Sequence, residues 1–255
     1  MPKKMSDMFR NALILACALF LFTPVPYCIE APGSTTNVLG KIDGKNLIAI
    51  EGHENHDPGQ LLMTTVSLIG RAQYGVPLYQ AVYSNFDSKS VVLPLDYVFP
   101  KNMTDTQYKE QNNKLMTKSQ NSAIVSAYNF LKMKKYPKTQ ISIENIGGPS
   151  AGLMFALGII DIVKNANLTG GNAIAGTGQI ANNGEVQAIG GIDQKIFGAA
   201  SSGAKFFLAP TSNCPDIEAE HKNIQIISVS TLNDAINSLE KIKENKLDSL
   251  PSCKK

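Results

Sequence analysis

A chain of 255 residues with 43% hydrophobic residues is long enough to bury one or two cores. Its formal net charge of +3 comes from dispersed basic residues and it has no tryptophan, so nucleic-acid binding finds no support. No stretch matches G-x-x-x-x-G-K-[ST], so we expect no built-in ATPase motor.

The amino terminus has the features of a membrane anchor. Lys3, Lys4 and Arg10 precede an apolar run from Ala12 to about Ile29 that is just long enough to cross a bilayer. The charge bias predicts a cytoplasmic segment over 1–10, a transmembrane helix over 11–29 and a body outside the cytoplasm. A cleaved signal peptide is the alternative, but no A-x-A site follows the run, which favours a retained anchor.

The region 30–99 is predicted to be mostly strand, and 46–50 and 60–69 are its two clearest strands. The loop between them, 51–59, holds His53 and His56 with acidic residues nearby. The loop contains glycine and proline and lacks the H-E-x-x-H pattern of a helical zinc site. We therefore expect a solvated hairpin tip and no metal site.

A long helix is predicted from Thr104 to Met133, because apolar residues recur there at helical spacing. A polar break over 134–138 follows it and contains Pro137.

The stretch 141–160 is predicted to place a serine on a strand-to-helix turn. Its first residues alternate like a strand, Gly147-Gly-Pro149 breaks the pattern, and an apolar helical run follows Ser150. Free N–H groups and a partial positive charge at a helix start stabilise negative charge, as acyl transfer requires. The alternative is an N-cap serine after a glycine loop. The candidate oxyanion donors are the backbone groups of Gly148, Pro149 and Ala151.

A second stretch, 189–204, is predicted to be a short helix with a lysine on its inward face. Ile192, Ile196 and Ala199 form that face, and Lys195 lies within it. Such a lysine either extends its amine back to water or is held neutral by burial. A neutral lysine is a general base, which a serine nucleophile needs.

The remaining elements are a hairpin with its turn at 182–184, strands at 205–209 and 224–229, and a helix over 231–243 capped by Thr231. The tail after Glu244 is expected to be loose. His221 lies in a polar run and is expected at the surface, so a Ser-His-Asp triad has no obvious histidine. Cys28, Cys214 and Cys253 are an odd set outside the apolar run, and a Cys28–Cys253 bridge is one possibility.

Several of these motifs occur together and in order: Gly148-Pro-Ser-Ala-Gly152, Gly176-Thr-Gly178, Ile189-Gly-Gly-Ile192 with Lys195, and Phe207-Leu-Ala-Pro210. Over about 141–214 the chain resembles the proteolytic domain of Lon-type serine proteases, especially the membrane-anchored Lon-like bacterial proteases without an ATPase. The resemblance implies that Ser150 is the nucleophile, Lys195 the general base and Thr177 a hydroxyl residue that helps orient the lysine. Asn213-Cys214 also resembles a position in this family.

The resemblance implies a mixed α/β (α+β) fold, of the Lon proteolytic type that is similar to domain 2 of ribosomal protein S5. We expect an N-terminal part over 30–138, a catalytic part over 139–244 and a polar tail over 245–255. Many membrane-anchored relatives carry a PDZ domain between these parts, and this chain has no room for one. The family also implies a homo-oligomeric ring.

The predicted function is that of an ATP-independent, membrane-anchored serine endopeptidase that needs no cofactor and acts on flexible or unfolded protein segments. Two alternatives stay open. A catalytically silent scaffold at the membrane would retain the fold without activity. A galactokinase-like small-molecule kinase would use Gly147–Gly152 as a phosphate loop, but Lys195 would have no role there.

Overall fold

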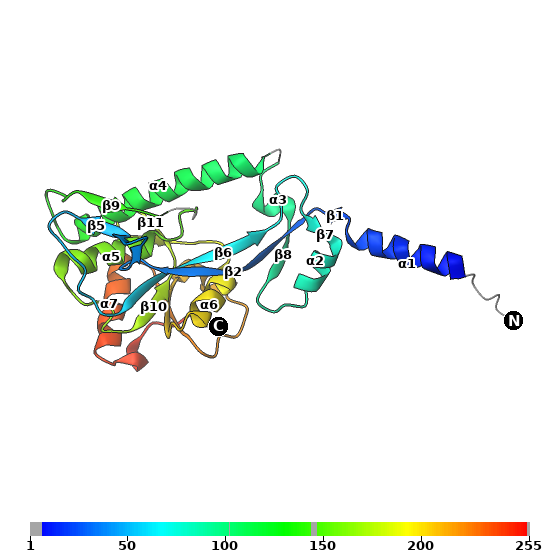
Figure 1. Ribbon diagram of the computed structural model, residues 1–255. Coiled ribbons are helices and arrows are strands. Elements are labelled where there is room, and N and C mark those ends of the chain that lie inside the picture. The colour runs from blue at the N-terminus through cyan, green and yellow to red at the C-terminus, as the bar shows by residue number, and fades with distance from the viewer. Residues whose placement is uncertain (1–6, 102, 144–146, 254–255) are drawn as a thin grey trace. The chain divides into compact units, whose positions relative to one another are not determined.

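The computed structural model describes residues 7–101, 103–143 and 147–253 (Figure 1). Most of the expected cytoplasmic segment, part of the approach to Ser150 and the last two tail residues lie outside the described residues. The chain divides into unit 1, residues 7–31 and 67–108, and unit 2, residues 32–66 and 109–253. The expectation of a mixed α/β fold is confirmed.

Unit 1 combines short helices with short strands. Its elements are α1 (Asp7–Leu21), β1 (Pro24–Val25), the start of β2 (Tyr27–Asn37), the end of β6 (Gln60–Ile69), β7 (Val76–Pro77), α2 (Leu78–Ser84), β8 (Val91–Pro94), α3 (Leu95–Val98) and the first turn of α4 (Asp105–Phe130). β1 pairs antiparallel with β7, and the first residues of β2 pair antiparallel with β8.

The predicted transmembrane helix over 11–29 is wrong in extent. α1 ends at Leu21, and the chain then enters β1 and β2. Pro24 and Pro26 have no amide hydrogen to continue a helix, and Tyr27–Glu30 use their backbone groups to pair with β8. Within residues 7–101, 103–143 and 147–253, no helix combines the length and the apolar character needed to cross a membrane.

The expectation of mostly strand over 30–99 is also wrong for two segments, which form α2 and α3. The residues of α2 are rich in types that favour strands, such as Tyr79, Val82 and Tyr83. Pro77, at φ −59° and ψ 145°, stands at the N-cap of α2, where its missing N–H removes no intrahelical hydrogen bond.

Unit 2 contains the remaining elements: the rest of β2, β6 and α4, together with β3 (Lys41–Ile42), β4 (Lys45–Asn46), β5 (Ile48–Ile50), β9 (Thr139–Ile141), α5 (Gly152–Lys164), β10 (Ala173–Gly176), β11 (Gln179–Ile180), β12 (Val186–Gln187), α6 (Ile192–Ser201), β13 (Phe206–Pro210), the 3₁₀ helix η1 (Thr211–Asp216), β14 (Gln225–Val229), α7 (Leu232–Lys243) and the 3₁₀ helix η2 (Leu247–Ser249). The long helix, the lysine helix, the late strands and the closing helix all match their predictions. Thr231 caps α7 through a capping box with Asp234.

A parallel sheet with the order β14-β13-β10-β6 organises unit 2. Its strands are apolar on both faces, as a sheet covered on both sides requires. Leu61, Met63 and Leu208 point to the face covered by α5 and α7, whereas Leu62 and Phe207 point to the face covered by α6. Alternate residues of each strand therefore join two separate cores.

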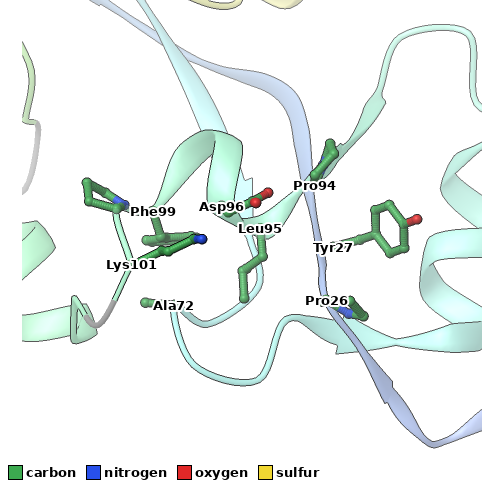
Figure 2. Close-up of a pocket in the computed structure, with 9 residues that line it drawn as sticks. Pro26, Tyr27, Ala72, Pro94, Leu95, Asp96, Phe99 and Lys101 are labelled. Atoms are coloured by element: carbon green, nitrogen blue, oxygen red, sulfur yellow. The ribbon is translucent and has the colours of Figure 1, made fainter.

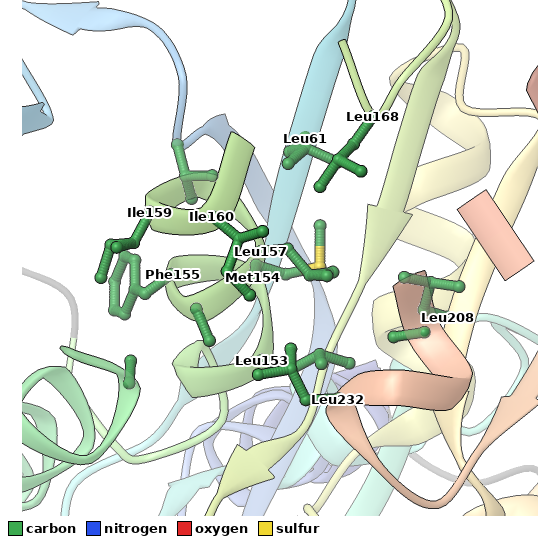
Figure 3. Packing of buried hydrophobic residues seen from close by; sticks show 14 of the residues in the cluster. Leu61, Leu153, Met154, Phe155, Leu157, Ile159, Ile160, Leu168, Leu208 and Leu232 are labelled. Atoms are coloured by element: carbon green, nitrogen blue, oxygen red, sulfur yellow. The ribbon is translucent and has the colours of Figure 1, made fainter. Parts of the chain in front are cut away.

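Helix α5 is the centre of the larger core, and residues from Gly152 to Ile162 are buried on all its sides. Figure 3 shows its side chains packed between the sheet and neighbouring helices; the labelled residues are Leu61, Leu153, Met154, Phe155, Leu157, Ile159, Ile160, Leu168, Leu208 and Leu232. Burying side chains of this size contributes about 1.5–3 kcal/mol each relative to exposure. The start of α5 is thus held rigidly.

The predicted hairpin of the strands at 46–50 and 60–69 is wrong. β5 pairs with β9, and β6 pairs with β10. The loop between β5 and β6 returns into the protein, because Asp57 is buried and accepts hydrogen bonds from the amide and the hydroxyl of Thr169. His53 and His56 lie in the same loop, and the described residues contain no cluster of three metal-ligating side chains.

The expected loose tail is wrong for residues 245–253. Ser252 forms a β-bridge with Ile227, and Cys253 forms a disulfide with Cys214, 39 residues earlier. The bridge between Cys28 and Cys253 that the sequence left possible is not formed, and Cys28 is a buried free thiol.

A buried carboxyl pair lies at the far end of α5. Asp161 accepts a hydrogen bond from the amide of Leu168, and burial, assisted by the neighbouring Asp57, raises the pKa of Asp161 to about 6. Between about pH 4 and pH 6, Asp161 is therefore protonated in the folded protein and ionised in the unfolded chain. Over that window the free energy of unfolding falls by about 3 kcal/mol as the pH rises.

We expect Asp161→Asn to remove this loss, because an amide stays neutral and can still accept from Leu168. Urea unfolding at pH 4 and pH 7 should show wild type losing stability across this window more than the variant does. Asp43→Asn, at an exposed turn, is the matched control. Equal pH dependence in wild type and Asp161→Asn would contradict the assignment.

Candidate active site

Helix α4 holds the loop before Ser150 at two points. The amide of Gly148 donates to the carbonyl of Asn112 (3.0 Å), and the buried hydroxyl of Ser119 donates to the carbonyl of Pro149 (2.8 Å). Asn112 and Ser119 are seven residues apart, so they lie two turns apart on one face of the helix. Gly148 has φ +88°, and a Cβ at Gly147 would lie 2.7 Å from the Cβ of Asn112. The loop therefore needs both glycines.

The backbone of Ser150 is fixed from the other side by the turn after β10. Its carbonyl accepts from the amide of Gly178 (2.8 Å) and from Oγ1 of Thr177 (3.1 Å). In return the amide of Leu153 donates to the carbonyl of Gly178 (3.0 Å). These bonds bring Thr177 against the backbone of Ser150 and place the partly exposed Ser150 just before α5. The predicted role of Thr177 in orienting Lys195 stays a prediction.

The three candidate oxyanion donors are not equivalent. Pro149 has no amide hydrogen, and the amide of Gly148 is engaged with Asn112. Ala151 is the remaining candidate, and it occupies the N-cap position of α5. The positive end of the helix dipole adds to any stabilisation of negative charge there.

Lys195 is buried, with 3% of its surface exposed, on the face of α6 that also carries Ile192 and Ile196. Its Nζ donates to the carbonyl of Gly190 (2.8 Å), in the loop just before its own helix. The side chain therefore folds back along α6 instead of extending to water, and the predicted burial is confirmed.

Asn213, which the sequence marked only by its family resemblance together with Cys214, makes contacts that were not predicted. Its side chain is bonded to the backbone of Ile189, and the adjacent Cys214 carries the disulfide to Cys253. An asparagine in a loop belongs to no helical or strand periodicity, so the sequence pattern could not predict the contact between Asn213 and Ile189.

The expectation that His221 lies at the surface is wrong. Its imidazole is 2% exposed, bonds to the carboxylate of Asp193 (2.7 Å) and packs on the ring of Phe197, 4.5 Å between centroids. Asp193 also accepts from the amides of Glu218 and Ala219. This cluster fastens the 217–221 segment to α6, the helix that carries Lys195.

The described part of the chain also contains hollows away from these contacts. One, in unit 1, is lined by Pro26, Tyr27, Ala72, Pro94, Leu95, Asp96, Phe99, Pro100 and Lys101 and includes none of the predicted site residues (Figure 2). Another, in unit 2, runs between β12 and η1 and is lined by Glu185, Val186, Gln187, Ala188, Thr211, Ser212, Ser230 and Thr231. The second adjoins the site along the chain, because it ends one residue before both Ile189 and Asn213.

The family model for the Lon protease (S16) C-terminal proteolytic domain matches residues 136–241. That range contains Ser150, Thr177, Lys195 and Asn213. The match supports a Lon-type proteolytic domain in this part of the chain, and with it the enzyme class of serine peptidase.

Curated relatives agree with this match. Lon protease 2 of Bacillus subtilis is 37% identical over 94 residues, which are 37% of this chain and 17% of the relative. Lon protease of Endomicrobium trichonymphae is 34% identical over 104 residues, 39% of this chain and 13% of the relative. Archaeal Lon protease of Archaeoglobus fulgidus is 32% identical over 96 residues, 36% of this chain and 15% of the relative. The chain thus aligns with about one sixth or less of each relative's length.

We expect Thr177→Val to slow the labelling of Ser150 by a fluorophosphonate about fivefold to tenfold. The change removes one of the two hydrogen bonds to the Ser150 carbonyl, and a bond of this kind contributes about 1 kcal/mol. Thr177→Ser keeps the hydroxyl and is the matched control. Equal labelling rates for the valine and serine variants would show that the hydroxyl does not position Ser150.

Proposed function

We propose that this chain is a Lon-like serine endopeptidase in which Ser150 is the nucleophile and Lys195 the general base. The observation that carries this proposal is how the backbone of Ser150 is held in place. Its carbonyl accepts two hydrogen bonds, its position is the start of a buried helix, and the segment that matches the Lon proteolytic domain also supplies an interior lysine. Thr177 helps to orient the pair.

The reaction follows from these groups. The neutral amine of Lys195 takes the proton of the Ser150 hydroxyl while the serine Oγ attacks the peptide carbonyl carbon. The amide of Ala151 and the start of α5 stabilise the oxyanion. The C–N bond then breaks, and the leaving amine takes the proton from Lys195. Water, deprotonated by Lys195, hydrolyses the ester and restores Ser150.

We also propose that cleavage needs no ATP hydrolysis by this chain and acts on flexible or unfolded segments. None of its 255 residues forms the G-x-x-x-x-G-K-[ST] motif, and a chain without a motor depends on substrates that are already extended. Assembly into a homo-oligomeric ring is proposed from the family resemblance.

We expect the full chain, in mild detergent and without ATP, to cleave casein, and Ser150→Ala and Lys195→Arg to lower the rate at least about 10³-fold. Arginine stays charged and cannot serve as a base. Lys205→Arg, at an exposed position ten residues later, is the matched control and should keep wild-type activity. Size-exclusion chromatography of the same preparation measures the oligomeric state.

A folded, oligomeric wild type that neither cleaves casein nor reacts with a fluorophosphonate would contradict the peptidase proposal and favour a scaffold. Cleavage that persists in Ser150→Ala would place the nucleophile elsewhere.

Membrane attachment through α1, with the catalytic unit outside the cytoplasm, is a further part of the proposal. All residues of α1 are exposed, including Phe9, Leu15 and Phe20. In α2 and the residues after it, the apolar side chains at i, i+3, i+4 and i+7 also face solvent; they are Tyr79, Val82, Tyr83 and Phe86. Tyrosine and phenylalanine suit a membrane interface. The Cys214–Cys253 disulfide supports an oxidising compartment.

We expect the full chain to float with phospholipid vesicles in a density gradient, and Leu15→Glu with Phe20→Glu to abolish flotation, because charges on the apolar helix oppose burial in lipid. Gln111→Glu with Asn113→Glu, on α4, adds the same charge elsewhere and should leave flotation intact. Flotation of all three proteins would show that α1 is not the attachment.

A further inference from the structure

The side-chain amide of Asn213 makes a two-point contact with the backbone of Ile189. Its Oδ1 accepts from the Ile189 amide (2.9 Å), and its Nδ2 donates to the Ile189 carbonyl (2.9 Å). Asn213 is 2% exposed, and its Nδ2 also donates to the Asp216 carboxylate (2.9 Å). These three hydrogen bonds of the Asn213 side chain go to Ile189, in the loop before α6, and to Asp216, in η1.

The residue after Ile189 supplies the acceptor for the lysine. The carbonyl of Gly190 receives Lys195 Nζ at 2.8 Å. No atom packs against Gly190 on its Cβ side, because nothing lies within 4 Å of the position where its Cβ would be. Two adjacent glycines have wide backbone freedom, so the direction of this carbonyl must be set from outside the pair.

Each side of the glycine pair has one fixed point. On the helix side, the carbonyl of Gly191 accepts the amide of Lys195 (3.1 Å), which starts α6. On the other side, Asn213 holds both backbone polar groups of Ile189 and so fixes the peptide planes on either side of that residue. The Gly190 carbonyl lies between these points, and releasing either one frees it to rotate.

We propose that Asn213 is a positioning residue for the general base: by clamping Ile189 it directs the Gly190 carbonyl at Lys195 Nζ. The inference rests on the proposed role of Lys195. A neutral amine has two N–H donors and one lone pair, so an N–H given to Gly190 restricts the lone pair to directions away from that carbonyl. After proton transfer the ammonium keeps the same acceptor, and the amine returns to the same place in each cycle.

The clamp is itself anchored. Asn213 lies in η1, and the next residue, Cys214, is covalently bonded to Cys253. The disulfide limits the movement of the turn that carries the Asn213 amide, and the contact with Ile189 is present without any bound substrate.

The test compares kcat and KM for a flexible peptide, with the full chain, in Asn213→Ala and Asn213→Asp. The aspartate variant is isosteric, keeps the acceptor for the Ile189 amide and loses the donor. Asn37→Ala is the matched control, because Asn37 Oδ1 also accepts two backbone amides in unit 2, those of Leu39 and Leu61 (3.1 Å each). Asp216→Ala removes only the bond at an exposed carboxylate.

We expect kcat to fall between about 10-fold and 100-fold in both Asn213 variants with KM changed less than about twofold, as for a displaced catalytic group. Asn37→Ala and Asp216→Ala should keep kcat within about threefold. A crystal structure of whichever Asn213 variant folds should show Lys195 Nζ no longer bonded to the Gly190 carbonyl.

Equal kcat in Asn213→Ala and Asn37→Ala, or a retained bond from Nζ to Gly190 in the variant structure, would overturn the inference while leaving the peptidase intact. A wild type that does not react at Ser150 would overturn the proposed function instead, and the variant structure would still decide whether Asn213 positions the lysine.

Discussion

The structure depends on the carbonyl of Ser150 being held by two donors at once. Thr177 and Gly178, at the end of a central strand, fix it from the sheet side, and α4 fixes the preceding loop through Asn112 and Ser119. A serine on a glycine-rich turn has no rigidity of its own. The site therefore takes its precision from elements that meet at the turn, not from the turn itself.

Two of those elements, α5 and β10, belong to the buried interior of unit 2. α5 starts two residues after Ser150 and is buried on all sides, and β10 lies between β13 and β6 in a parallel sheet with both faces covered. A close-packed interior resists displacement. Lys195 belongs to α6, which packs on the opposite face of the same sheet, so the sheet lies between the two helices that carry the proposed nucleophile and the proposed base.

Periodicity predicted most of unit 2. The apolar stripe around Lys195 revealed its burial, and Thr231 with Asp234 revealed the start of α7, because both signals are local. Sequence-based predictions were wrong where a residue contacts partners far away along the chain, or where apolar residues of a helix face solvent. Asp57 has a polar neighbourhood in sequence but is buried against Thr169, and His221 is buried by Phe197 and Asp193.

Two other misses illustrate these two causes, an apolar stripe that faces solvent and a contact between distant residues. α2 was hidden because its apolar stripe faces solvent, whereas periodic patterns are normally read as facing a core. The Cys214–Cys253 pairing could not be chosen among three cysteines, because only the fold brings residues 39 positions apart together. The contact of Asn213 with Ile189 needs that same long-range arrangement.

The position of that disulfide has a consequence for how the protein matures. Cys214 belongs to the turn that faces the lysine loop, but its partner is synthesised 39 residues later. During synthesis, Ser150, Thr177 and Lys195 are therefore made before Cys214, in η1, can form its disulfide. The bond forms only after Cys253 has been made, so this turn gains its covalent anchor later than Ser150, Thr177 and Lys195 are synthesised.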